Sequence, residues 1–264
     1  YATITAQGIS FVISIFYLKR HHVFFGTTVC KKLAVQWDKI VAILKIGLPT
    51  AIQMVVVNTA YLLVTGMLNQ FGTSVSAASG VGLQINTFAG MPCWAVGQAV
   101  TAMVGQCMGA EQIKRARKVV KIGLLVNIAM TLVVVLCIQV FAEQLILLFG
   151  SNSLEVVTDG VYYLRVCCGV NSLIYAAMYT LDSFAIGVGA ANVAMLNALL
   201  DAVVVRLPVS WILAFTLGMG FPGIYFGQAL SPILPAFVGF IYFKSGIWER
   251  KSLIQKSRKE GNPE

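Results

Sequence analysis

Residues 97–121 read GQAVTAMVGQCMGAEQIKRARKVVK, and the rest of the chain is best interpreted from this stretch. An apolar run ends in the Gly-rich segment 105–110, and a second apolar run covers residues 122–141. Between them, five basic residues fall within eight positions: Lys114, Arg115, Arg117, Lys118 and Lys121. Long apolar stretches joined by a short basic turn are typical of two membrane helices connected on the cytoplasmic side. The stretch therefore predicts a membrane hairpin.

The composition supports a membrane protein along the whole chain. Apolar residues make up 58% of the 264 residues, charged residues only 11%, and the mean hydropathy is +0.82. A soluble domain carries about a quarter charged residues. We therefore expect an all-α, polytopic membrane helix bundle of about seven transmembrane helices.

The apolar runs and the segments between them define the expected organisation. We expect spans, to about three residues at each end, at 1–18, 46–68, 80–103, 122–141, 161–186, 193–215 and 224–243. Pro92 lies inside the third span, where a proline can kink or break a helix. Glu143, Glu155 and Asp159 are expected in the loop after the fourth span. The domains follow as a first helix 1–18, a cytoplasmic linker with an interfacial helix 19–45, a six-helix bundle 46–243 and a cytoplasmic tail 244–264.

The formal net charge of +9 is explained by membrane orientation. Six Lys or Arg lie in residues 19–45, five in 114–121 and six in 244–259, and the remaining two, Arg165 and Arg206, lie inside apolar runs. Basic residues confined to alternate loops follow the positive-inside rule. The pattern places the C-terminus in the cytoplasm and the N-terminus outside, and it argues against nucleic-acid binding.

Residue types with catalytic or metal-binding chemistry do not form recognisable motifs. The six cysteines form neither a CxxC nor a Cys/His spacing, and the apolar runs contain no Ser/Lys, Ser/His or His-Glu-x-x-His arrangement. We therefore expect no metal site, no cofactor and no enzymatic activity.

Charged residues inside the spans need a reason to be there, because each costs roughly 2.5–3.5 kcal/mol near mid-bilayer. At 1.5 Å per residue, Asp182 lies about 6 Å, Asp201 about 12 Å and Arg206 nearly 20 Å from the cytoplasmic helix ends. Arg165 lies near the outer end of its span, where its side chain can reach the headgroups. Asp201 and Arg206 are five residues apart, about 140° round an α-helix, so we do not expect them to pair within the helix.

Two interpretations of these residues stay open. In the first, Asp182, Asn197 and Asp201 line a polar cavity in the inner half of the bundle, with Arg206 as a counter-charge above them. In the second, they form buried interhelical pairs that only hold the helices together.

Uncharged polar residues form stripes on two further spans. The second span carries Gln53, Asn58, Tyr61 and Thr65, and the third carries Gln84, Thr87 and Gln98. Such stripes either hydrogen-bond neighbouring helices together or line a substrate cavity.

Several ordered motifs resemble the C-terminal half of the multidrug and toxic compound extrusion (MATE) family. They are Lys45-Ile46-Gly47-Leu48-Pro49, Phe71-Gly72, Val104-Gly105-Gln106 with Gly109-Ala110 and Lys114-Arg115-Ala116, Arg206-Leu207-Pro208, and Tyr242-Phe243-Lys244-Ser245-Gly246-Ile247-Trp248. The resemblance covers essentially the whole chain.

The resemblance implies a fold and an activity. Members have twelve helices in two bundles of six and export cationic or amphipathic compounds by alternating access, in antiport with protons or sodium ions. This chain would hold the second bundle and the last helix of the first, so we expect the sequence to be truncated at its N-terminus and to need the missing N-terminal bundle as a partner. Asp182 is the best local candidate for an ion-linked carboxylate. The expected location is the lipid bilayer of the bacterial inner (plasma) membrane.

Two other functions fit parts of the pattern. A lipid-linked glycan flippase of the same wider superfamily would need a more strongly cationic central cavity than Arg206 supplies. A seven-helix receptor would share the topology with its N-terminus outside and its C-terminus inside.

Overall fold

The computed structural model describes residues 2–20, 37–149, 153–169 and 171–249 and divides the chain into two units, Tyr1–Ile43 and Leu44–Glu264. The first unit holds helix α1, Ala2–Arg20, whose side chains from 4 to 17 are exposed. Of the linker expected at 19–45, residues 21–36 lie outside the described residues, and the segment expected to form an interfacial helix begins at Trp37. This segment is the start of α2, Trp37–Leu68.

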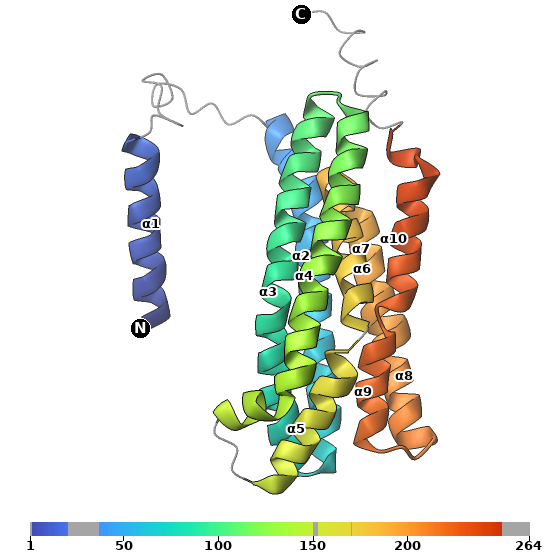
Figure 1. The fold of residues 1–264 in the computed structure, drawn as a ribbon. Helices are drawn as coiled ribbons and strands as arrows, with labels where there is room; N and C mark the ends of the chain where they lie inside the picture. The colour runs from blue at the N-terminus through green and yellow to red at the C-terminus, as the bar shows by residue number, and fades with distance from the viewer. Residues whose placement is uncertain (1, 21–36, 150–152, 170, 250–264) are drawn as a thin grey trace, which may run out of the picture. The chain divides into compact units, whose positions relative to one another are not determined.

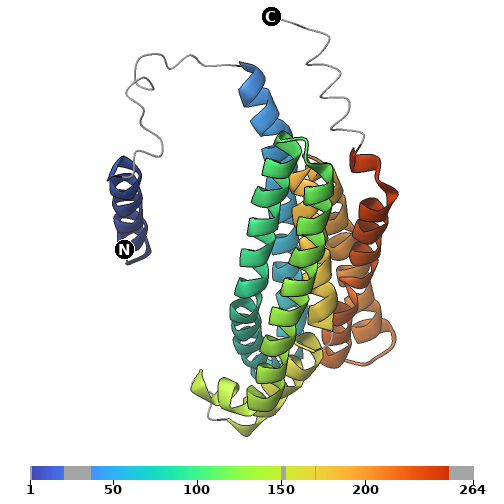
Figure 2. The ribbon, with the colours of Figure 1, turned by 45° about the horizontal axis from the view of Figure 1, so that its top comes forward.

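The second unit is built from helices, most of which run roughly along one direction (Figures 1 and 2). After α2 follow η1 (Asn69–Phe71), α3 (Thr73–Gly109), α4 (Ile113–Leu148), α5 (Leu154–Cys167), α6 (Asn171–Gly187), α7 (Ala191–Leu199), η2 (Leu200–Arg206), α8 (Leu207–Trp211), η3 (Ile212–Thr216), α9 (Phe221–Leu230) and α10 (Ile233–Ser245). Helix α3 packs against α4, α5 and α6, and α10 packs against α6. The helical bundle predicted from the sequence is confirmed.

Several of these helices can cross a membrane by length and composition. In the described residues they are Ile43–Phe71, Ile113–Leu148, Ala191–Thr216 and Phe221–Ser245, and the bent pair α5 and α6 makes a fifth if it is one span. The apolar part of α1, Ile4–Tyr17, is shorter, and α3 is not among them. The membrane spans expected at α1 and α3 therefore remain predictions.

The structure differs from the sequence-based expectation at three places. The fifth span is not continuous, because α5 and α6 meet at an angle of 51°. Glu143, Glu155 and Asp159 lie within α4 and α5, not in a loop, because α4 continues past a kink at Phe141 and α5 begins at Leu154. Figure 1 shows the last part of α4 turned aside after this kink. Helix α3, in contrast, runs on unbroken through Pro92.

Carbonyl groups at the α5–α6 break accept hydrogen bonds from side chains. The Gln139 Nε2 of α4 donates to the carbonyl oxygens of Cys168, at 3.1 Å, and Leu164, at 3.4 Å. Asn171 Nδ2 donates to the Cys167 carbonyl at 3.1 Å. Because an apolar bundle offers no water to these groups, such side-chain donors allow a helix to break at membrane depth.

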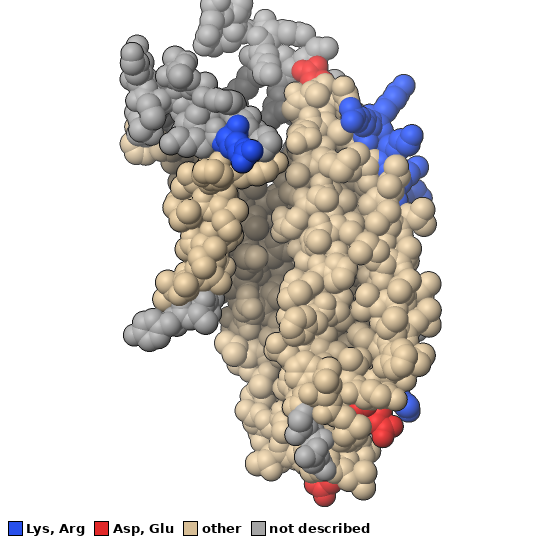
Figure 3. Space-filling view, turned by 60° about the vertical axis from the view of Figure 1, so that its left-hand side comes forward, with Lys and Arg blue, Asp and Glu red and all other residues tan. Residues whose placement is uncertain are grey.

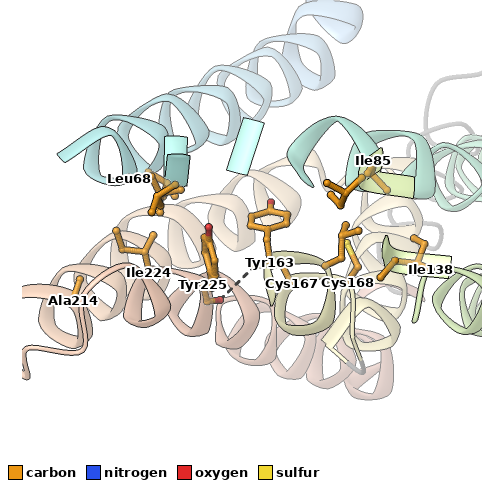
Figure 4. Close-up of a cluster of buried hydrophobic side chains, with 14 residues drawn as sticks. Leu68, Ile85, Ile138, Tyr163, Cys167, Cys168, Ala214, Ile224 and Tyr225 are labelled. Carbon is orange, nitrogen blue, oxygen red and sulfur yellow. Dashed lines mark hydrogen bonds between the residues drawn. The ribbon is translucent and has the colours of Figure 1, made fainter. Parts of the chain in front are cut away.

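The first of two apolar clusters, the α5 cluster, includes side chains from the second half of α5 (Figure 4). Its buried members come from α2, α3, α4, α5, η3 and α9: Val64, Leu68, Val75, Ile85, Ile138, Ala142, Ile146, Tyr163, Leu164, Cys167, Cys168, Ala214, Ile224 and Tyr225. The rings of Tyr163 and Tyr225 meet edge to face with their centroids 4.9 Å apart. Aromatic pairs prefer this geometry because the ring edge is positive and the ring face negative.

The second apolar cluster, the Trp248 cluster, includes side chains from the end of α3 and the start of α4. It consists of Val100, Val104, Cys107, Ala116, Val120, Phe184, Val188, Ala190 and Trp248. Gly246 ends α10 in the left-handed conformation, at φ 66°, and turns the chain so that Trp248 is fully buried. Its ring meets Phe184 edge to face at 5.0 Å, and its Nε1 donates to the Phe243 carbonyl at 3.1 Å. The residues after α10 thus close one end of the bundle.

The close contact between α9 and η3 requires a glycine at position 223. A Cβ atom built on Gly223 would lie 2.7 Å from the backbone of Leu213 and Ala214 in η3. Small residues let membrane helices approach backbone to backbone, where dispersion contacts replace the missing hydrophobic driving force. Gly223 therefore fixes how closely α9 approaches η3.

Basic side chains predominate at one end of the bundle and acidic side chains at the other, although Glu111 lies at the basic end (Figure 3). The five basic residues of the α3–α4 turn and the start of α4 are exposed at one end, and Glu143, Glu155 and Asp159 lie toward the other. Arg165, predicted to reach the headgroups, is exposed on α5.

We expect Trp248→Ala to lower the free energy of unfolding by roughly 3–5 kcal/mol, the usual cost of removing a buried large aromatic ring. Ile247→Ala is the matched control, because the neighbouring side chain is 59% exposed. Denaturant unfolding of the detergent-purified full-length protein measures both. Equal losses in the two variants would show that burial of Trp248 does not hold this end of the bundle together.

Candidate functional site

A set of polar side chains is buried apart from the two apolar clusters. We define the central polar cluster as Tyr61, Asp182, Asn197, Asp201, Arg206 and Ser231. Asp182, Asn197, Asp201, Arg206 and Ser231 are all at most 4% exposed, and Tyr61 is half-buried. Burying such groups is unfavourable unless each finds a hydrogen bond or an opposite charge. The contacts below show how far this structure meets that condition.

Asp182 and Asn197 connect α6 to α7. The Asn197 Nδ2 atom donates to the Asp182 Oδ1 atom at 2.6 Å. The Asn197 side chain is neutral, so this contact satisfies a carboxylate oxygen without supplying a positive charge. In the described part of the chain, no Lys, Arg or His forms an ion pair with Asp182.

Asp201 and Arg206 form a buried ion pair, with 2.7 Å between Arg206 Nη2 and Asp201 Oδ2. The prediction that they would not pair within their helix is therefore wrong. The helix is not an α-helix here: η2 is a π-helical segment, in which the Leu207 N–H bonds to the Ala202 carbonyl five residues earlier. In the wider π turn, residues five apart come close to one face.

The neighbouring sequence gives a local reason for the π-helical segment. Pro208 has no N–H and cannot bond to the carbonyl of Val204, so the regular α-helical ladder is interrupted just after Arg206. A second π-helical segment, η3, follows α8, with the Leu217 N–H bound to the Ile212 carbonyl.

Arg206 also joins two other parts of the bundle. Its guanidinium carbon lies 4.6 Å from the centre of the Tyr61 ring on α2, a cation–π contact. Its Nε atom donates to the Ser231 Oγ atom at 3.3 Å, where α9 ends. The Arg206 Nη1 and Asp201 Oδ1 atoms are buried without a hydrogen-bond partner among the described residues.

The remaining predicted site residues are not brought into this cluster. Asn58 is exposed on α2, and its Nδ2 donates to the Met54 carbonyl of the same helix at 2.7 Å. Gln84 and Gln98 are exposed on α3, and Gln53 is half-buried on α2.

A small cavity lies next to the stripe on α2. It has a volume of about 40 Å³ and is lined in part by Tyr61, Thr65, Ser79, Tyr163 and Gln228. This volume has room for water molecules but is far below the roughly 300–1,000 Å³ of a site for a drug-sized ligand.

Sequence reasoning missed one buried polar contact among α3, α4 and α6. Asn127 on α4 is fully buried, and its Nδ2 donates to the Thr180 Oγ1 at 2.8 Å and to the Ala176 carbonyl at 3.3 Å. The signal was an asparagine in the strongly apolar run 122–141, because a membrane helix rarely carries an amide without a polar partner. Among the described residues, no three His, Cys, Asp or Glu side chains gather in a way that could hold a metal ion.

Comparisons with known proteins agree on one family. The family model described as MatE matches residues 49–212, more than half of the chain. The chain is 28% identical over 255 residues to "Probable multidrug resistance protein YpnP" of Bacillus subtilis, which covers 96% of this chain and 56% of that protein. It is 23% identical over 223 residues to "Probable multidrug resistance protein NorM" of Thermotoga maritima. This alignment covers 84% of this chain and 48% of that protein.

Solved structures show the same fold. A Vibrio cholerae MATE transporter, VcmN in its bent form, superimposes with a TM-score of 0.81 at 21% identity, covering 96% of this chain and 56% of that chain. An outward-facing multidrug resistance MATE family transporter superimposes with a TM-score of 0.70 at 23% identity. The superposition covers 78% of this chain and 46% of that chain. The chain thus spans about half the length of these proteins.

We expect Asp201→Leu and Arg206→Met each to lower the free energy of unfolding by roughly 3–5 kcal/mol, because each leaves a buried charge unpaired. The double variant Asp201→Leu/Arg206→Met should lose less than either single variant, since it leaves no charge behind. Arg165→Gln, at an exposed arginine, should change the value by at most about 0.5 kcal/mol. Denaturant unfolding of the full-length protein in detergent measures all four, and additive losses in the double variant would contradict the buried pair.

Proposed function

Because the chain belongs to the MatE family, we propose that it forms one helical bundle of a secondary active exporter that removes small molecules from the cell. The central polar cluster carries the proposal, since it places carboxylates deep inside a bundle with membrane-spanning helices. The matched relatives are named as multidrug resistance proteins, and the matched structures as transporters. Transport, and no catalysis, is therefore the activity to test.

Ion coupling is assigned to Asp182 within this proposal. Asp201 already has a cationic partner in Arg206, whereas Asp182 has the neutral Asn197. A carboxylate buried without a counter-charge is unstable, so a proton or a sodium ion binds there favourably. Binding and release of that ion at Asp182 would drive the exchange for substrate. The carboxylate is thus free to exchange ions, while the Asp201–Arg206 pair stays internally neutral.

Substrate contact is assigned to side chains that the bundle does not bury. Trp94 on α3 is 36% exposed, and its Nε1 donates to the Tyr175 hydroxyl at 3.4 Å. Tyr175 and Tyr179 stack with their centroids 6.2 Å apart, next to the exposed Gln98. Aromatic faces attract organic cations through the ring quadrupole, which supports cationic or amphipathic substrates.

A second bundle would complete the substrate cavity. The cavity beside α2 is too small for a drug-sized molecule, and Asn58, Gln84 and Gln98 are exposed on this bundle. We assign these exposed amides to the surface that faces this second bundle, across the substrate pathway.

The same proposal places the protein in the bacterial plasma membrane with its basic end in the cytoplasm. The exposed basic residues at the α3–α4 turn support this orientation through the positive-inside rule. The C-terminus, which follows α10, would then be cytoplasmic.

The charge of the buried cluster weighs against a glycan flippase. Such a protein needs free positive charge for a lipid-linked pyrophosphate, whereas Arg206, the buried arginine of the described cluster, is balanced by Asp201.

We expect Asp182→Asn to abolish ion-driven export, because the amide cannot release a proton or bind a cation with a full negative charge. The measurement is substrate flux in vesicles that contain the full-length protein, with an imposed proton or sodium gradient. Glu155→Gln is the control with the same loss of charge at an exposed position on α5, and it should transport at the wild-type rate. Wild-type flux in a correctly inserted Asp182→Asn protein would refute the assignment.

A further inference from the structure

Helix α4 carries a narrow stripe of basic and apolar side chains on its outer face. The stripe consists of Lys114, Lys118, Lys121, Leu125, Leu132 and Leu136, all exposed. At 3.6 residues per turn these six side chains fall within about 60° of one another around the helix axis. The other face of α4 is buried, with Ala116, Val120 and Asn127 each fully enclosed, so the stripe points away from the bundle. We call it the α4 stripe.

The lysines of the α4 stripe have no acidic partner in the part of the chain that the structure describes. Two neighbouring arginines on α4 are already engaged: Arg117 forms an ion pair with Glu249, and Arg115 Nη1 donates to the neutral Gln112 Oε1 at 3.2 Å. The three ammonium groups are therefore available to an anion from outside the described chain. Figure 3 shows how basic side chains gather at this end.

The apolar half of the stripe continues directly below the charges. Leu125 is 70% exposed, Leu132 44% and Leu136 56%. Lys121 and Leu132 are eleven residues apart, which is about 16 Å along a helix and close to half of the roughly 30 Å hydrocarbon core. One lipid tail covers this distance when its headgroup lies at the lysines.

We propose that the α4 stripe is a binding site for an anionic phospholipid, with the headgroup phosphate on Lys114, Lys118 and Lys121 and an acyl chain along the leucines. The charges select the headgroup, because each Lys or Arg near the surface adds a comparable increment of attraction to anionic lipids. The leucines distinguish a lipid from free phosphate, which makes no use of an apolar surface. The proposed lipid site does not depend on the proposed transport function, so an experiment can refute either proposal without refuting the other.

The test counts lipids bound to the detergent-purified full-length protein by native mass spectrometry. Phosphatidylglycerol and phosphatidylcholine are titrated separately, each with and without inorganic phosphate. The stripe variant carries Lys114→Gln, Lys118→Gln and Lys121→Gln. The matched control carries Lys45→Gln, Arg115→Gln and Lys244→Gln, three exposed cations outside the stripe, so both variants lose the same charge. These substitutions lie on the surface, where changes in stability stay within about 0.5 kcal/mol.

We expect the wild-type protein and the control variant to bind phosphatidylglycerol with affinities within twofold of each other, and the stripe variant to bind it roughly a hundredfold more weakly. Leu125→Ala with Leu132→Ala should also weaken binding severalfold, and inorganic phosphate should not displace the lipid. On the wild-type protein alone, raising the salt concentration should weaken phosphatidylglycerol binding.

Three results would each overturn the proposal. Equal losses in the stripe and control variants would mean that net charge alone attracts the lipid. Equal binding of phosphatidylcholine would mean that the lysines do not select the headgroup. Displacement by inorganic phosphate, with no effect of the leucine substitutions, would reduce the site to a simple anion contact.

Discussion

The ion pair between Asp201 and Arg206 connects more parts of this bundle than any other polar contact described above. Two opposite charges enter an apolar interior on one helix and neutralise each other because the backbone widens into a π-helical turn. The same guanidinium then contacts the Tyr61 ring on α2 and the Ser231 hydroxyl at the end of α9. The segment η2, helix α2 and the end of α9 thus meet around one charge. Removing a partner of a buried charge is strongly destabilising, so these contacts hold the three elements together.

The interior separates polar from apolar side chains. The α5 cluster and the Trp248 cluster are apolar, and the buried polar groups of the central polar cluster belong to neither of them. In the central polar cluster the two aspartates are not equivalent. Asp201 is neutralised by an arginine, whereas Asp182 is held by an amide, and a low dielectric amplifies this difference. The proposed ion coupling at Asp182 rests on this difference between one neutralised and one uncompensated carboxylate.

The surface complements this interior. Amide and aromatic side chains on α2, α3 and α6 remain uncovered, which agrees with a chain that spans about half the length of its relatives. Lysines and leucines of the α4 stripe lie on another exposed face of the bundle. Because α4 has a buried face against α3 and α6, its outer face is left for a different environment. The amides suit a polar pathway and the stripe suits lipid.

The sequence by itself determined that this is a helical membrane protein, where most of its spans lie and which charged residues the bundle buries. Hydropathy, helical periodicity and the distribution of Lys and Arg are local properties, so a single sequence is sufficient for them. Only the tertiary structure decided which side chains the buried polar residues contact. Asp201 pairs with Arg206 because of a π-helical register, and Tyr61 reaches the cluster while Asn58 on the same predicted stripe does not. These outcomes depend on the hydrogen-bond register of the backbone and on how each helix is rotated against its neighbours, which contacts between distant residues set.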